Sequence, residues 1–264
     1  MRSVVLIALG FWVATAVSTT VPTSYDNFKV LRVQTPELNS VNVINNDLKD
    51  YVDIWAEPRL GFHSDIMVSS HDLLMVEQRL LAANLEYSIM IENVQTLIDN
   101  ENVQSNISLS FHVMDHPMDW TSYHSQDDME AYMDYLVEKY PELISTEVIG
   151  KSYEGRTMRI LKICRGGTCG QKPAMWIDAG IHSREWVTSS TATYIMNELV
   201  ENGEKYPREI IDQLDWYILP VLNPDGYEYS RTSDRMWRKS RQVVSTYNFK
   251  SFHEQHLTNM EINH

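Results

Sequence analysis

The chain has 264 residues, of which 43% are hydrophobic, and a formal net charge of -14 at pH 7. This composition is typical of a globular protein and excludes a disordered chain, and the length suits one large domain, or a small domain followed by part of a larger one. The acidic balance argues against nucleic acid and anionic membrane surfaces as partners, because phosphate binding needs clustered Lys and Arg.

The first residues follow the pattern of a secretory signal peptide, which we predict over 1–18. A short basic start precedes an apolar run from Val4 to Val13, and small residues follow at Ala16 and Ser18. We therefore expect a secreted, extracellular protein without a membrane span. An uncleaved N-terminal anchor is the alternative, but the apolar run is short for a membrane-spanning helix.

Residues 25–98 alternate between strand-like and helix-like patterns in the order strand, helix, strand, strand, helix, strand. Ser40 is the expected cap of the first helix, and Ser69 or Ser70 that of the second. This order predicts a small ferredoxin-like α+β sandwich as the N-terminal domain. The predicted strands are 28–33, 52–55, 65–68 and 87–91.

A polar segment follows, and we predict a linker over residues 99–118. Asn, Glu, Gln and Ser dominate its first half. Within it, Asn106 begins an Asn-Ile-Ser triplet, which is an N-glycosylation acceptor in a secreted protein, although many such triplets stay unused.

Residues 119–241 predict a second domain of the α/β class with a mixed sheet. An acidic amphipathic helix is expected at 127–140, and a second helix at 187–200. Strand-like runs are expected at 144–149, 158–164, 174–179 and 214–221. The run at 174–179 is apolar enough for a central strand, and a ligand site should lie beyond the strand ends.

Two cysteines, Cys164 and Cys169, flank Arg-Gly-Gly-Thr between two of these strands. In an oxidising compartment, thiols this close across a tight turn could form a disulfide. The alternative is a pair of reduced, half-buried cysteines. The spacing excludes a zinc knuckle, because no second pair of Cys or His accompanies it.

The segment after the run at 174–179 contains the strongest candidates for functional residues. It turns at Gly180 and then presents His182, Arg184 and Glu185. His and Glu three residues apart, just past a buried strand, are ligands of the kind that a catalytic zinc takes, with Arg184 placed to meet a substrate anion. Simpler interpretations are a histidine satisfied within a loop and a glutamate that favours the N-terminal end of the next helix.

Several separated motifs occur in one order along the chain. They are Trp55 to Gly61, Val94-Gln95, the strand leading to His182–Trp186, Asn223-Pro-Asp-Gly-Tyr227 and Arg235-Met-Trp-Arg-Lys239. With them the chain resembles a zinc metallocarboxypeptidase of the pancreatic, digestive A/B type in its zymogen form. The resemblance runs from about Tyr25 to Arg241. It implies that 25–98 is a propeptide and that 119–241 is the first part of a catalytic domain.

The resemblance implies a role for each residue that matches the family motifs. His182 and Glu185 would be two zinc ligands, and zinc would be the cofactor. Arg238 would be catalytic, stabilising the carbonyl oxygen as it becomes anionic. Arg184 and Arg235, together with Arg238, would bind substrate. The resemblance also implies that Asp178 orients a zinc-bound histidine. It further implies peptide and protein C-termini as substrates, and a monomer.

The chain also departs from the family pattern. We find no counterpart for a third zinc ligand, a general-base glutamate, an Asn-Arg pair that binds the terminal carboxylate, or a tyrosine that closes over the substrate. From Gln242 the sequence no longer follows the pattern, so we treat 242–264 as a divergent tail. His253 and His256 lack the spacing of a zincin helix. We therefore expect a truncated form, from an incomplete gene model or an alternative transcript.

A further departure concerns activation. Zymogens of this family are usually cut after a basic residue in the connector, yet there is no Lys or Arg between Arg79 and Lys139. We expect an activating protease of non-tryptic specificity.

Two functional hypotheses follow, one of an enzyme and one of a binding protein. The first is a secreted zinc exopeptidase that removes single residues from peptide C-termini. The second is a non-catalytic binding or inhibitory isoform, in which the propeptide module acts on a full-length relative. A non-functional fragment is a third possibility, and it would show no cooperative unfolding.

Overall fold

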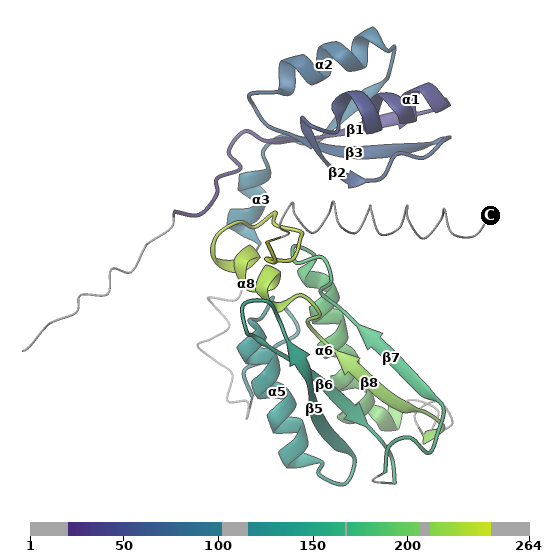
Figure 1. Ribbon diagram of the computed structural model, residues 1–264, viewed down its shortest axis with the longest axis vertical. Helices are drawn as coiled ribbons and strands as arrows, with labels where there is room; N and C mark the ends of the chain where they lie inside the picture. The colour runs from purple at the N-terminus through teal and green to yellow at the C-terminus, as the bar shows by residue number, and fades with distance from the viewer. Residues whose placement is uncertain (1–20, 102–115, 167, 206–211, 244–264) are drawn as a thin grey trace, which may run out of the picture.

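The computed structural model describes residues 21–101, 116–166, 168–205 and 212–243. The predicted signal peptide at 1–18, Asn106, His253 and His256 lie outside these ranges. Figure 1 shows two units, each built around one four-stranded sheet. In the described part of the chain, no helix has both the length and the hydropathy that a bilayer crossing requires.

The N-terminal unit confirms the predicted ferredoxin-like sandwich. Its elements are β1 (Lys29–Thr35), α1 (Leu38–Asn42) with the π-helical η1 (Val43–Leu48), β2 (Val52–Ala56), β3 (Phe62–Val68), α2 (Leu73–Ala82) and β4 (Tyr87–Ile91). The sheet has the order β2-β3-β1-β4, and every pair is antiparallel. Alternate side chains of β1 and β3, such as Leu31 and Ile66, pack with Val76 and Leu80 of α2 in one buried cluster.

One of the two predicted helix caps is wrong. Glu37 precedes α1, and Ser40 is buried within its first turn. Asp72 precedes α2, and its backbone N–H donates to Ser69 Oγ at 3.1 Å. Ser69 Oγ thus accepts the backbone N–H three residues on, and Ser69 O accepts from Leu73 N at 3.1 Å, which is the capping contact predicted for Ser69. Short polar side chains favour both arrangements, so the residue type alone could not choose between them.

The second unit is a mixed α/β layer, as predicted. After α3 (Val94–Asn100), its elements are α5 (Gln126–Lys139), β5 (Ile144–Lys151), β6 (Thr157–Ile163), β7 (Ala174–Asp178), α6 (Trp186–Val200), the 3₁₀ turn η2 (Gly203–Lys205), β8 (Asp215–Leu219) and α8 (Pro224–Thr232). The sheet has the order β5-β6-β8-β7, with β7 parallel to β8 and the other pairs antiparallel.

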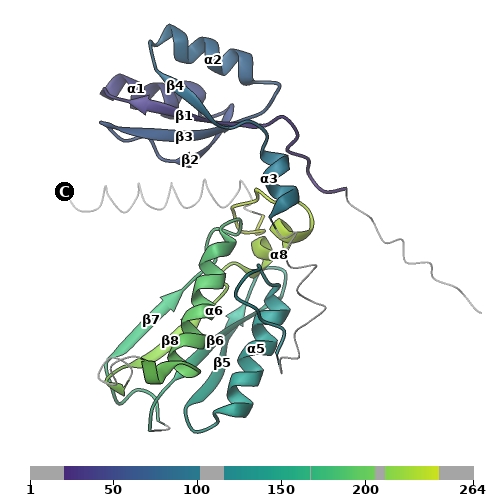
Figure 2. The same ribbon diagram turned by 180° about the vertical axis from the view of Figure 1, so that it is seen from behind.

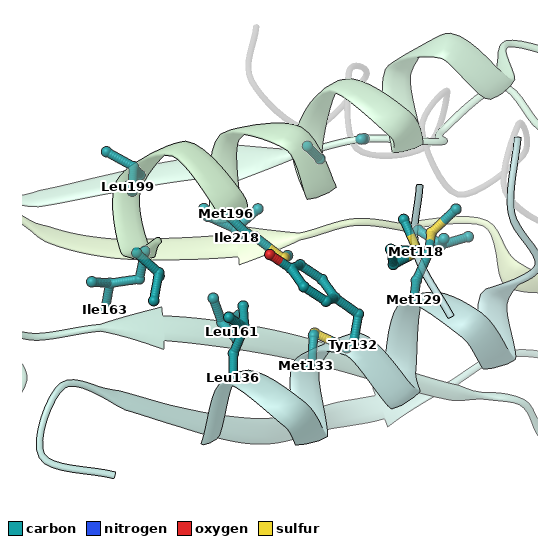
Figure 3. Close-up of a cluster of buried hydrophobic side chains, with 14 of the residues drawn as sticks. Met118, Met129, Tyr132, Met133, Leu136, Leu161, Ile163, Met196, Leu199 and Ile218 are labelled. Atoms are coloured by element: carbon teal, nitrogen blue, oxygen red, sulfur yellow. The ribbon is translucent and has the colours of Figure 1, made fainter. Parts of the chain in front are cut away.

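The core of this unit lies between the sheet and the helices α5 and α6. Figure 3 shows Tyr132 and Leu136 of α5 meeting Met196 of α6 and Leu161 of β6. The helix α5 begins at a capping box, in which Ser125 and Asp128 exchange side-chain and backbone hydrogen bonds. Its apolar stripe and its cap agree, which explains why its bounds were predictable to within one residue.

The prediction that 174–179 forms a central strand is wrong for the described residues. There β7 lies at one edge of the sheet and pairs with β8 alone. Met175 and Trp176 remain 41% and 48% exposed. The apolar composition of this run is therefore not matched by burial within the described part of the chain.

The two cysteines form a disulfide. Cys164 and Cys169 are joined by an S–S bond of 2.03 Å. The loop that they close lies at the Asp215 end of β8, where the backbone N–H of Gly170 donates to the buried Asp215 carboxylate at 2.7 Å. The disulfide is therefore remote from the Gly180 turn at the other end of the neighbouring strand β7.

The two units meet at α3 and α8, which lie next to each other in both Figure 1 and Figure 2. Tyr25 and Val94 of the N-terminal unit form a buried cluster against which Met236 of the second unit packs. The Tyr25 hydroxyl donates to Asp234 at 2.5 Å, and the backbone N–H of Thr23 donates to Ser233 O at 2.7 Å. The N-terminal segment is thus bound directly to the second unit.

Candidate metal centre

The loop that carries the predicted zinc ligands begins with a glycine that no other residue could replace without strain. Gly180 has φ +67, and a Cβ built there would lie 2.9 Å from Ser189 Oγ and 3.4 Å from Val221 Cα. The chain therefore turns sharply at the end of β7 and passes close to the segment that follows β8. Residues 181–185, which include the predicted ligands, follow this turn directly.

The structure brings His182 and Glu185 together. His182 Nδ1 lies 3.1 Å from Glu185 Oε1, and both side chains are partly exposed. Glu185 precedes α6 but makes no side-chain cap hydrogen bond, which counts against a purely capping role. Two ligands of one tetrahedral zinc, with bonds of about 2.0–2.1 Å, lie about 3.3 Å apart. The two donors therefore have a separation that fits one zinc ion.

The donor set is short of the three protein ligands that a catalytic zinc normally has. Among the residues that the structure describes, no group of three or more His, Cys, Asp or Glu side chains is placed to hold a metal ion. His253 and His256 lie outside those residues. The described part of the chain thus contributes two donors of a possible zinc site.

Asp178 does not contact His182 in the described structure. Its Oδ1 accepts a hydrogen bond of 3.0 Å from Trp176 Nε1, two residues back along β7. Its role in orienting a zinc-bound histidine therefore stays a prediction.

Two of the three predicted arginines are paired with carboxylates of the N-terminal unit. Arg184 Nη1 forms an ion pair with Asp53 Oδ2 of β2, and its side chain is 11% exposed. Arg235 binds both carboxylate oxygens of Glu101 at 2.5 Å. Both pairs are charge-assisted, and the second has the bidentate geometry of strong arginine–carboxylate contacts.

Arg238 differs from the other two arginines. It is exposed, and among the described residues its guanidinium has no hydrogen bond or ion pair. It lines a cleft of about 540 Å³ together with His182, Ile181 and Asn223. A cation and a candidate metal ligand thus face the same open space.

The floor of this cleft contains a buried carboxylate, Asp225. It accepts hydrogen bonds from Ser152 Oγ at 2.5 Å, from Glu154 N at 2.9 Å and from Arg156 Nη1 at 2.9 Å. Burial alone would raise the pKa of Asp225, but these hydrogen bonds and the Arg156 charge outweigh it and lower the pKa. Asp225 therefore stays ionised and fixes the loop at 152–156 against the start of α8.

The sequence analysis did not identify Asp53, Glu101 or Asn223 as site residues. Asp53 and Glu101 lie 131 and 134 residues before the arginines that they bind. An acidic residue in a strand and another after a helix have no local pattern that indicates such partners. Asn223 belongs to the Asn-Pro-Asp-Gly-Tyr motif, which contributed to the family resemblance but gave the asparagine no role of its own.

Comparison with known proteins agrees with this architecture. The sequence profile described as zinc carboxypeptidase matches residues 129–263, and the profile described as carboxypeptidase activation peptide matches residues 31–101. The first match includes the segment after residue 241, so the boundary of the divergent tail stays a prediction.

Two curated relatives illustrate the extent of the similarity. The chain is 36% identical to carboxypeptidase A1 of Bos taurus over 225 residues, which are 83% of this chain and 53% of that protein. It is 52% identical to carboxypeptidase B of Astacus astacus over 129 residues, which are 49% of this chain and 42% of that protein. The chain thus spans about half the length of the curated relatives that it matches.

Solved structures show the same relation. Carboxypeptidase A from Helicoverpa armigera has a TM-score of 0.75 and 26% identity, covering 84% of this chain and 55% of that chain. Thrombin activatable fibrinolysis inhibitor has a TM-score of 0.70 and 26% identity, covering 84% of this chain and 56% of that chain. From these matches and the fold, the chain belongs to the zinc carboxypeptidase family, with an activation peptide preceding its catalytic part.

Proposed function

We propose that this protein is a secreted zinc metallocarboxypeptidase zymogen that hydrolyses the C-terminal peptide bond of peptides and proteins. The observation that carries the proposal is the approach of His182 Nδ1 and Glu185 Oε1 to 3.1 Å beside the cleft that Arg238 lines. Family membership supports zinc as the metal. The activity itself is a proposal, because the chain spans about half the length of its relatives.

In this function each described residue has a defined task. His182 and Glu185 would hold the zinc, together with a donor from outside the described residues. When bound, zinc supplies Lewis-acid polarisation of the scissile carbonyl and lowers the pKa of a bound water. Arg238, exposed in the cleft, is placed to stabilise negative charge that develops on the carbonyl oxygen. Arg184 and Arg235 would bind the upstream part of the substrate.

The contacts between the two units support an inactive zymogen. Arg184 and Arg235 are engaged by Asp53 and Glu101, so neither guanidinium is free to meet a substrate anion. Removal of the propeptide would release both cations. An activation peptide implies a protease that cuts it away, and the lack of Lys and Arg between Arg79 and Lys139 favours one of non-tryptic specificity.

The test of the function measures metal and turnover on the full chain. We expect about one zinc per chain and, after cleavage of the connector, hydrolysis of N-acylated dipeptides with a free C-terminus. His182→Ala should remove the zinc, whereas His63→Ala, a matched change at an exposed position of β3, should retain it. Absence of both zinc and turnover in the unmodified chain would contradict the proposal.

A second candidate is a non-catalytic inhibitor of a full-length relative. Two observations favour it. The described residues supply two metal donors and no group of three, whereas Arg184 and Arg235 are each already paired with a propeptide carboxylate. Inhibition of an active relative by this chain, without turnover of its own, would support this candidate. Asp53→Asn should then weaken the inhibition.

A further inference from the structure

Asn223 makes hydrogen bonds to three separate parts of the second unit. Its Oδ1 accepts from Gly226 N at 3.1 Å and so caps α8. Its Nδ2 donates to Ile181 O at 3.3 Å and to Lys239 O at 3.1 Å. Both hydrogens of the amide are therefore used, and they point to two different segments of the chain.

These two segments are the ones that carry the proposed chemistry. Ile181 immediately precedes His182, and Lys239 immediately follows Arg238. The segments also bond directly to each other, because Ser183 N donates to Arg238 O at 3.2 Å and Ser183 Oγ donates to Trp237 O at 2.6 Å. Asn223 lies beside this direct contact and bonds a carbonyl on each side of it.

The helix α8 approaches the amide and both segments closely at Gly226. A Cβ built on Gly226 would lie 2.5 Å from Asn223 Nδ2, 2.7 Å from Lys239 O and 2.8 Å from Ser183 Cβ. The glycine thus leaves just enough room for α8 to approach both segments.

The chemistry of the position calls for an amide. Two carbonyl oxygens need two N–H donors, and the helix cap needs one acceptor, which is the inventory of asparagine. Aspartate has the same shape and caps helices equally well, but it has no donor and would place a negative charge beside two carbonyl oxygens. The substitution Asn223→Asp can therefore keep the helix cap and remove the two hydrogen bonds that the amide donates.

We propose that Asn223 is a positioning residue, which fixes the loop of His182 and the segment of Arg238 relative to each other by bonding one carbonyl in each. This inference rests on the proposed function for its catalytic meaning, since it acts on the distance between the metal donors and the cation that faces them. It assigns a task to the Asn-Pro-Asp-Gly motif beyond that of a turn.

The experiment compares amide hydrogen exchange in the full chain before and after substitution. Asn223→Asp and Asn223→Ser both keep a helix-capping oxygen, and the serine is too short to reach both carbonyls. We expect exchange of the Ser183 amide to rise about tenfold relative to the Cys164 amide, which donates to Leu143 O at the far end of the sheet. Asn93→Asp, a matched change at the cap of α3, should leave this ratio unchanged.

Two results of the exchange experiment would overturn the inference. The first is equal acceleration of the Ser183 and Cys164 amides, which is the signature of a general loss of stability. The second is an unchanged Ser183 amide in both variants. If the unmodified chain hydrolyses peptides, Asn223→Asp should also lower kcat about tenfold with little change in KM, and an unchanged kcat would contradict the positioning role. A chain without turnover contradicts the proposed function alone, because the exchange experiment still decides on Asn223.

Discussion

The three arginines near the candidate metal centre are held in different ways. Arg184 and Arg235 are largely buried, and each binds a carboxylate from the N-terminal unit. Arg238 stays exposed in the cleft beside His182. A largely buried cation that loses its partner is costly, whereas an exposed one is solvated. The propeptide carboxylates are therefore part of what stabilises the folded chain.

A double-mutant cycle measures this contribution at the residue scale. We expect Asp53→Asn and Arg184→Gln to be coupled by about 1 kcal/mol in the free energy of unfolding, because Arg184 is largely buried whereas Asp53 is partly screened by solvent. The control is the more exposed pair of Lys162 and Glu147, at 3.0 Å, where we expect about 0.5 kcal/mol. Both are obtained from urea unfolding, and equal coupling in the two cycles would contradict the argument.

Asp225 predicts a pH dependence. Its pKa is lowered in the folded chain, so its contribution to stability is complete above the ordinary aspartate pKa of about 3.9 and is lost as the pH falls through the lowered value. At pH 7 we expect Asp225→Asn to cost about 2 kcal/mol, since it removes a charge partner of Arg156. The difference between variant and unmodified chain should shrink below about pH 4, as followed by urea unfolding. A difference that stays constant with pH would refute this account.

At the scale of elements, the tightest described contact of the site is the one between α8 and the two segments that carry His182 and Arg238. We expect Gly226→Ala to destabilise the chain by about 2–3 kcal/mol, because the new methyl group would overlap backbone and side-chain atoms within 3 Å. Gly150→Ala on β5, where no atom lies within 4 Å, should change stability by less than about 0.5 kcal/mol. Thermal unfolding compares the two, and similar effects would show that crowding is not the cause.

Elements with two agreeing local signals were predictable. The helix α5 combines an apolar stripe with a capping box, and β4 is bounded by turn residues on both sides. The start of α1 was missed because Ser40, a common cap, is instead buried within the helix. The pair of His182 and Glu185 was predictable from spacing, whereas Asp53 and Glu101 reach their arginines through the docking of two units, which no local pattern records.

At the scale of the whole molecule, the two units meet where α3 lies next to α8 (Figure 2), and the N-terminal segment also binds Asp234 of the second unit. Tyr25 is 8% exposed and packs edge-on against Phe28 at 5.0 Å. Burial raises the pKa of Tyr25, and its hydrogen bond to Asp234 raises it further, so the hydroxyl stays a donor.

Removal of this hydroxyl should loosen the connection between the units. We expect Tyr25→Phe to reduce the free energy of unfolding by about 1.5–3 kcal/mol, the range for hydrogen bonds to charged groups. Tyr51→Phe, at a residue that is 41% exposed, should stay within about 0.5 kcal/mol. Denaturant midpoints of the two variants provide the comparison, and a Tyr25→Phe chain as stable as Tyr51→Phe would exclude a role for the bond.

The position of β7 in the sheet has a consequence for how the site responds to heat or denaturant. The loop of His182 and Glu185 follows a strand that pairs with β8 alone among the described residues, so within that part of the chain the sheet supports it from one side. The geometry of this loop depends instead on the turn at Gly180 and on the contacts of the loop with neighbouring segments. Warming should therefore disrupt the arrangement of His182 and Glu185 at temperatures where α5, β5 and β6 are still folded.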